Sequence, residues 1–150
     1  PDGSRISRFS VSKASPPQID SESELPIITW LAGGHNGCDL AFDNSGCLLI
    51  STGDATEPSP PDRLKTGQDI SDLLSSILRI DVRGATKEKP YAIPKDNPFR
   101  EVARARGDGW AFGFRNPWGI AVDAAAGFRF LGDVGADFRD AYENETRKDT

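Results

Sequence analysis

Two loop segments, His35-Asn36 and Arg115-Asn116, carry the side chains of this 150-residue chain that are best suited to chemistry. A neutral histidine can take a proton from an alcohol near neutral pH. An arginine beside an asparagine amide can stabilise negative charge that develops on a nearby oxygen. Together the two pairs suit the oxidation of an alcohol. The alternative is that His35 and Arg115 only bond backbone carbonyls at tight turns, and spacing alone leaves both interpretations open.

The two pairs occupy equivalent places in an internal repeat. A shift of 80 residues aligns 30–43 with 110–123, and five of the fourteen positions are identical. Average residue usage would give roughly one identity. The similarity extends upstream, where Arg8-Phe-Ser-Val11 resembles Arg79-Ile-Asp-Val82, and downstream to a turn with Gly, a hydrophobic strand and a Gly-Asp pair. Each repeat unit therefore holds about four strands.

The repeat predicts an all-β fold. Fifteen Gly and eleven Pro favour turns and short strands over long helices. Four-stranded units at roughly 1–54 and 76–135 favour a β-propeller, with long loops at about 54–69 and 83–108, where Pro and Gly accumulate. Two units cannot close a ring, so residues 1–150 are expected to form a partial propeller domain that is incomplete at both ends.

One segment has both helical and strand character. Between residues 70 and 78 the apolar side chains have the i, i+3, i+4, i+7, i+8 spacing of an amphipathic helix. The run 77–82, however, matches the β-rich part of the other unit. We expect a helical turn near 70–75 followed by a strand, because tertiary pattern overrides local propensity.

Charge and composition limit the class of partner. A net charge of -5 and a pI near 4.9 argue against nucleic acid, which is bound largely through clustered Lys and Arg. Acidic loops instead favour a cation, and no apolar run is long enough to span a membrane. Cys38 and Cys47 flank a predicted hairpin turn at 43–46 and lie too far apart for a mutual disulfide. The chain starts without Met, so we expect its true start to have been lost, together with any compartment signal.

Six motifs follow one another between residues 35 and 135: His35-Asn-Gly-Cys-Asp-Leu-Ala-Phe-Asp, Ile50-Ser-Thr-Gly-Asp54, Ser76-Ile-Leu-Arg-Ile-Asp-Val82, Ile93-Pro-Lys-Asp-Asn-Pro-Phe99, Phe114-Arg-Asn-Pro-Trp118 and Gly132-Asp-Val-Gly135. In this order they resemble the glucose/sorbosone dehydrogenase family, and their joint occurrence is highly specific. The resemblance covers most of this chain but only a middle portion of a family member. It implies that the chain is a fragment of a six-bladed β-propeller.

The resemblance also implies an activity. Characterised family members are soluble, calcium-dependent quinoproteins that oxidise aldose sugars with pyrroloquinoline quinone (PQQ). His35 would correspond to the general base that removes the sugar hydroxyl proton. Arg115 and Asn116 would contact the quinone oxygens, while the hydride transfer itself is the chemistry of the cofactor.

A calcium site is implied at the second Gly-Asp pair. The segment Gly132-Asp-Val-Gly135 resembles the family segment whose backbone carbonyls hold Ca²⁺, which fits the preference of a hard cation for oxygen ligands. The metal candidates are therefore Asp133, Val134 and Gly135. The alternative is a Gly-rich turn that only reverses the chain, with Asp133 capping its own backbone.

For the parent protein the resemblance implies a periplasmic or extracellular oxidoreductase with a sugar substrate and a haem or other electron-acceptor domain as a possible partner. The isolated 150-residue chain should be inactive, because the basic residues that grip the cofactor carboxylates belong to later blades. One alternative is a non-catalytic propeller of the same family that serves as a binding module. Another is a structural β-array whose open sheet edges contact a protein partner.

Two positions depart from the family pattern. Cys38 stands where the family usually has Gly, and Gly119 stands where a larger polar residue often follows the Asn-Pro-Trp. Neither change removes a proposed catalytic group. A metal cluster of His35, Cys38 and Asp39 is a further alternative, although this spacing matches no recognised closed zinc pattern.

Four other residues carry structural expectations. Trp30 and Trp110 lie at equivalent strand positions and are expected to pack between blades rather than to form sugar platforms. Asp54 and Asp69 stand on either side of a Pro-rich loop and are expected to be solvated.

Overall fold

The computed structural model describes residues 3–58 and 62–135, and this part of the chain contains eight β-strands and one short 3-10 helix. The strands are β1 (Ser4–Val11), β2 (Ile19–Trp30), β3 (Gly37–Phe42), β4 (Leu48–Thr52), β5 (Ser76–Ile80), β6 (Gly109–Phe112), β7 (Pro117–Asp123) and β8 (Phe128–Asp133), and the helix η1 is Thr66–Gln68. The prediction of an all-β fold is confirmed. No helix within the described ranges is long and apolar enough to cross a bilayer.

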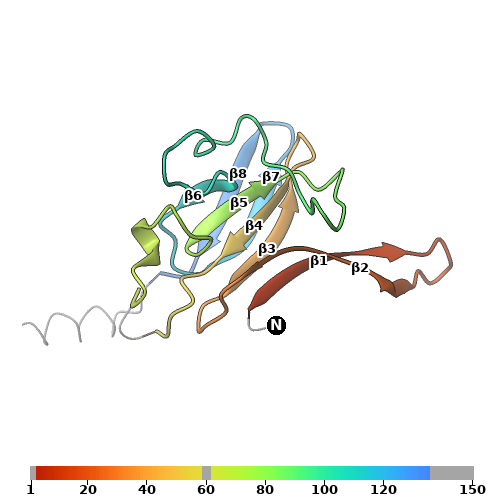
Figure 1. The fold of residues 1–150 in the computed structure, drawn as a ribbon, viewed down its shortest axis with the longest axis horizontal. Helices are drawn as coiled ribbons and strands as arrows, with labels where there is room; N and C mark the ends of the chain where they lie inside the picture. Colours follow the sequence, from red (N-terminus) through yellow and green to blue (C-terminus); the bar gives the residue numbers. More distant parts are fainter. Residues whose placement is uncertain (1–2, 59–61, 136–150) are drawn as a thin grey trace, which may run out of the picture.

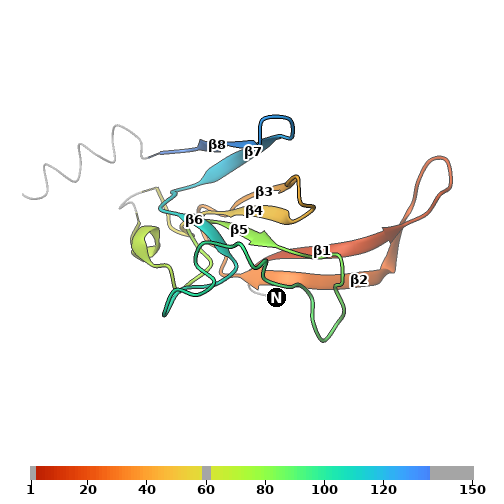
Figure 2. The same ribbon diagram turned by 90° about the horizontal axis from the view of Figure 1, so that it is seen from above.

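Hydrogen bonds group the strands into three antiparallel sheets (Figure 1). Strands β3-β4-β5-β6 form a four-stranded sheet, whereas β1-β2 and β7-β8 are two-stranded. The sheets are stacked in chain order (Figure 2). The number of strands is that of two four-stranded units, but the sheet boundaries fall inside the sequence repeat, after β2 and after β6. The loops that carry His35 and Arg115 are therefore the connections between successive sheets.

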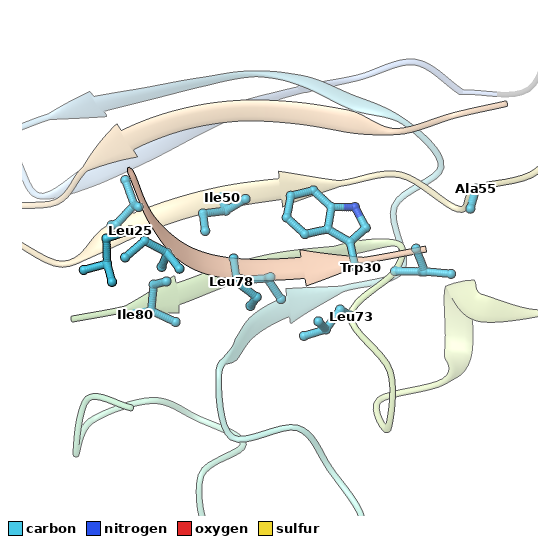
Figure 3. Close-up of a cluster of buried hydrophobic side chains, with 11 residues drawn as sticks. Leu25, Trp30, Ile50, Ala55, Leu73, Leu78 and Ile80 are labelled. Carbon is cyan, nitrogen blue, oxygen red and sulfur yellow. The ribbon is translucent and has the colours of Figure 1, made fainter. Parts of the chain in front are cut away.

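The hydrophobic core lies between β1-β2 and the four-stranded sheet. Strands β4 and β5 are buried along their whole length, because they are the central strands and are covered on both faces. Ile50 and Leu78 from these strands form one cluster with Leu25 and Trp30 of β2 (Figure 3). Full burial of a Leu or Ile side chain is worth about 1.5–3 kcal/mol. The cluster therefore fixes the end of β2, immediately before the His35 loop, against the central sheet.

The segment with mixed character, 70–78, separates into turns and a strand. The predicted strand is confirmed by β5, which pairs with β4 from Ser76↔Thr52 to Ile80↔Leu48. The predicted helical turn is wrong, because residues 70–75 form turns and bends and the 3-10 helix lies earlier, at η1. The carboxylates of Asp69 and Asp72 accept hydrogen bonds from backbone N–H groups two residues later, which competes with helix formation.

The hairpin between β3 and β4 is closed by Asp43. Its Oδ1 accepts hydrogen bonds from the backbone N–H groups of Ser45 and Cys47 at 2.9 and 3.0 Å. Cys47 is buried and Cys38 is exposed, and both are free thiols, as their spacing predicts.

Polar contacts join the central sheet to β7-β8. The Asp43 carboxylate accepts hydrogen bonds from Arg79 at 2.6 Å and from Arg129 at 3.2 Å. Both guanidinium carbons lie 4.9 Å from the ring centroid of Trp110, within the range of a cation–π contact. Trp110 thus lies at the junction of the central sheet with β7-β8, and the buried Trp30 lies in the core between β1-β2 and the central sheet.

Two direct hydrogen bonds also tie β7 to the central sheet. The backbone N–H of Ile120 in β7 donates to Oδ2 of Asp39 in β3 at 2.6 Å. The Ser51 hydroxyl in β4 donates to the carbonyl oxygen of Pro117 at 2.8 Å. These bonds set the position of β7, and of the loop that precedes it, relative to β3.

Candidate functional site

The loop between β2 and β3 brings His35 onto the segment that follows β4. The backbone N–H of Ala55 donates to the carbonyl oxygen of His35 at 2.9 Å. A Cβ on Gly33 would lie 1.8 Å from the oxygen of Ala55, and one on Gly34 would lie 2.3 Å from the oxygen of Thr56. Only glycine permits such a close approach. The two glycines therefore fix the position from which His35 projects.

The imidazole of His35 is held by the carboxylate of Asp54. The distance from Nδ1 to Oδ1 is 2.9 Å, and the two side chains are 10% and 1% exposed. The backbone N–H of Thr56 donates to the same carboxylate oxygen at 2.9 Å. A carboxylate beside Nδ1 selects the tautomer with its proton on Nδ1 and leaves Nε2 as the basic nitrogen. The arrangement is that of a base with an orienting acid.

The burial of Asp54 corrects the expectation that it is solvated. Asp69 is exposed, as expected. Asp54 was missed because its partner lies 19 residues away and nothing local marks the contact. A signal did exist, since a Gly-Asp pair lies at the end of the last strand of each repeat unit, at Gly53-Asp54 and at Gly132-Asp133.

The second Gly-Asp pair also fastens a loop, but it does so through backbone groups. The carboxylate of Asp133 accepts hydrogen bonds from the backbone N–H of Arg115 at 3.1 Å and from that of Asn116 at 2.8 Å. The Arg115 guanidinium donates to the carbonyl oxygens of Val134 at 3.2 Å and Gly135 at 3.0 Å. Asp54 thus holds the side chain of His35 in one unit, and Asp133 holds the backbone of Arg115-Asn116 in the other.

The two loops form one hydrogen-bonded unit. The backbone N–H of Asp54 donates to the carbonyl oxygen of Arg115 at 2.9 Å, and that of Gly37 donates to Oδ1 of Asn116 at 3.0 Å. Asn116 is buried and Arg115 is partly buried. The structure therefore brings together the two segments that the repeat singles out, while their catalytic and quinone-binding roles stay predictions.

The oxygens of the 133–135 segment fit a cation in part. The carbonyls of Val134 and Gly135 both accept a hydrogen bond from one guanidinium nitrogen of Arg115, so a calcium ion on these oxygens would have to displace that group. They suit two of the about six to eight oxygen ligands that Ca²⁺ takes. The Asp133 carboxylate is already engaged by two amides. The calcium assignment stays a prediction.

The alternative of a zinc-like cluster does not form. Across residues 3–58 and 62–135, no group of three or more His, Cys, Asp or Glu side chains is placed to hold a metal ion. His35, Cys38 and Asp39 therefore do not make such a site. Burial raises the pKa of the Cys38 thiol, and the nearby Asp39 carboxylate adds to the rise. Neither effect favours the thiolate that a zinc site needs.

Cys38 adopts a backbone conformation that disfavours a side chain, with φ at 85°. A left-handed conformation costs a non-glycine residue about 1–2 kcal/mol, and glycine loses about 0.5–1 kcal/mol in chain entropy. We therefore expect Cys38→Gly to raise the free energy of unfolding, measured in urea, by up to about 1 kcal/mol. Cys38→Ala keeps the strain and should give no such gain. Equal gains in both variants would show that the thiol, and not the backbone, is the source.

Comparison with known proteins places these features in a family. Residues 21–144 match the family model described as Glucose / Sorbosone dehydrogenase. The aldose sugar dehydrogenase YliI of Escherichia coli (strain K12) is 32% identical over 103 residues, which are 69% of this chain and 24% of the relative. Human Hedgehog-interacting protein is 30% identical over 121 residues, or 79% of this chain and 17% of the relative. This chain thus spans about a quarter or less of these curated relatives.

Solved structures agree with the sequence relatives. A glucose dehydrogenase structure matches with a TM-score of 0.67 at 25% identity and covers 87% of this chain and 37% of its own. The soluble aldose sugar dehydrogenase of Escherichia coli matches with a TM-score of 0.58 at 23% identity, covering 87% of this chain and 39% of its own, and shows likeness of fold. The predicted family resemblance and the predicted propeller fragment are both confirmed. The chain belongs to the glucose/sorbosone dehydrogenase family.

Proposed function

We propose that this chain is part of a PQQ-dependent sugar dehydrogenase in which His35, oriented by Asp54, is the general base. The buried hydrogen bond between these two side chains is the observation that supports the proposal. A histidine that only fastened a turn would need no buried carboxylate of its own, because a backbone carbonyl would suffice. Membership of the family supports a dehydrogenase-type protein, and the identity of the base is the further step.

His35 would act through its Nε2 atom. This nitrogen would take the proton from a sugar hydroxyl, and the Asp54 carboxylate would stabilise the imidazolium that results. The close approach of Gly33 to Ala55 would hold the ring in place during the transfer. PQQ, when bound, would supply the hydride acceptor.

Arg115 and Asn116 would contact the quinone oxygens. The guanidinium is a permanent positive charge that suits oxygens on which negative charge develops. Ca²⁺ would use the carbonyl oxygens of Val134 and Gly135, and Asp133 would hold the loop through its two amide contacts. The electron acceptor, such as a haem domain, and a periplasmic or extracellular location remain parts of the same proposal.

A second candidate is a non-catalytic binding module. The similarity to Hedgehog-interacting protein favours it, because that relative is named for a protein partner and not for a reaction. On this interpretation the contact between His35 and Asp54 only fastens the loop, and the sheet edges or loops contact a partner.

A titration distinguishes the two candidates. The parent protein is titrated with PQQ in the presence of Ca²⁺, and dye reduction is then measured with a panel of aldoses. We expect saturable PQQ binding, sugar-dependent dye reduction and loss of both on removal of Ca²⁺ with a chelator. A folded parent that binds no PQQ would contradict the dehydrogenase and leave the binding module.

A further inference from the structure

Three polar atoms beneath the His35 loop are buried without a hydrogen-bond partner among the described residues. They are Nε1 of Trp30, Oδ2 of Asp54 and Oγ1 of Thr56. The three residues are 5%, 1% and 1% exposed. Buried polar atoms in folded proteins nearly always have a partner, which is either protein or ordered water. Each of the three atoms is therefore expected to have an ordered partner such as water.

The three residues that carry these atoms are all linked to Ala55. Asp54 and Thr56 are its neighbours in the chain, and the N–H of Thr56 already bonds the Asp54 carboxylate. Trp30 belongs to the same buried cluster as Ala55. In Figure 3 the indole nitrogen of Trp30 faces the end of the cluster at which Ala55 lies. One small molecule between these side chains could serve all three atoms.

The chemistry of the three atoms matches a water molecule. The indole N–H only donates, an ionised carboxylate oxygen only accepts, and a hydroxyl can do either. A water can accept one hydrogen bond and donate two, so it satisfies the whole set. A cation does not, because the indole N–H points its positive end at the site. Buried waters typically make about three such bonds.

We propose that a buried water molecule is held between Trp30, Asp54 and Thr56 and supports the orientation of His35 through the Asp54 carboxylate. Oδ1 of Asp54 already serves His35 and the amide of Thr56. The water serves Oδ2 and so fixes the plane of the carboxylate. Trp30 and Thr56 thereby become positioning residues for the base. This last role rests on the function proposed above, whereas the water site does not.

High-resolution crystal structures of the parent protein test the water site. We expect density for one ordered water within hydrogen-bond distance of the three atoms in the wild-type protein and in Thr56→Ser. Thr56→Val removes the hydroxyl at nearly constant shape, and Trp30→Phe removes the indole N–H together with part of the ring. We expect the water to be lost or displaced in both. An empty site in the wild-type protein, or an unchanged water in both variants, would overturn the proposal.

Kinetics test the positioning role separately. We expect Thr56→Val to lower kcat about tenfold with KM nearly unchanged, and Thr56→Ser to restore it. Thr86→Val, at an exposed position in the 83–108 loop, is the matched control and should leave kcat unchanged. A lost water with full kcat would overturn the positioning role alone. A parent with no dehydrogenase activity would refute the proposed function and leave the crystallographic test of the water intact.

Discussion

Replacing His35 with Ala in the parent protein is expected to lower turnover by about two to four decades. The affinity for PQQ should stay nearly unchanged, because the loss is that of a proton acceptor and the cofactor contacts are assigned to Arg115 and Asn116. The measurement is kcat at saturating PQQ and sugar, with the dissociation constant of PQQ from a separate titration. A fall in kcat and kcat/KM together identifies an interaction made in the transition state.

Asp54→Asn is the matched variant for this prediction. It keeps the size of the side chain but removes the carboxylate that selects the tautomer of His35. We expect a substantial loss of kcat in a protein of near-normal stability.

Unchanged turnover in His35→Ala would remove this residue from the mechanism. A change confined to the melting temperature would show that it only fastens the loop.

The largest effect on stability is expected from Arg79→Ala, at about 3–5 kcal/mol. The Arg79 guanidinium is buried and donates to Asp43 at 2.6 Å, to Asp96 and Ser45 at 2.8 Å, and to Asn97 at 3.0 Å. The Asp43 side chain is itself fully buried. Truncation of Arg79 therefore leaves a buried carboxylate whose remaining cationic partner, among the residues that the structure describes, is the partly exposed Arg129.

Urea unfolding measures this loss, with Arg83→Ala as the control. Arg83 makes a similar contact with Asp81 at 2.6 Å, but its side chain is largely exposed. Exposed ion pairs are worth about 0–1 kcal/mol, so the control should unfold almost as the wild-type protein does. Similar losses of unfolding free energy in the two variants would mean that burial does not determine how much the Arg79 pair contributes to stability.

The buried pair of Arg79 and Asp43 also makes the unfolding free energy depend on pH. Burial raises the pKa of Asp43, but hydrogen bonds from Ser45 and Arg79 outweigh it and hold the pKa far below its usual range. A carboxyl whose pKa is lowered on folding stabilises the protein above its unfolded pKa of 3.8, and this stability is lost as the pH falls toward the folded pKa. We expect the unfolding free energy of the wild-type protein to fall more steeply below about pH 4 than that of Arg79→Ala.

Much of the fold follows from sequence pattern, because strands and turns leave local marks. The shift of 80 residues locates both candidate loops, and each proves to precede the first strand of a sheet. The repeat cannot say which strands share a sheet, since hydrogen-bond pairing depends on geometry between units. The predicted helical turn at 70–75 failed for a local reason, which is that Asp69 and Asp72 cap their own backbone.

The candidate site was only half visible in the sequence. His35 and Arg115 stand out by residue type and repeat position. Asp54 does not, because an acid beside a Pro-rich loop is usually solvated. In the structure Asp54 is buried, at a place where Gly33 and Gly34 pack closely against the chain after β4. A long-range contact of this kind has no signature within a single stretch of sequence. The paired Gly-Asp dipeptides were the one usable clue.

The bonds from Ile120 to Asp39 and from Ser51 to Pro117 have a mechanical consequence. Apolar side chains can slide over one another at little cost, whereas a directional bond to a backbone atom allows a single alignment. Neighbouring sheets so joined cannot rotate against each other without breaking a specific contact. Mutations that loosen the apolar core could then make the molecule less resistant to heat while the two loops kept their spacing. The thermal stability of the protein and the spacing of the two loops would thus be separable in this fold.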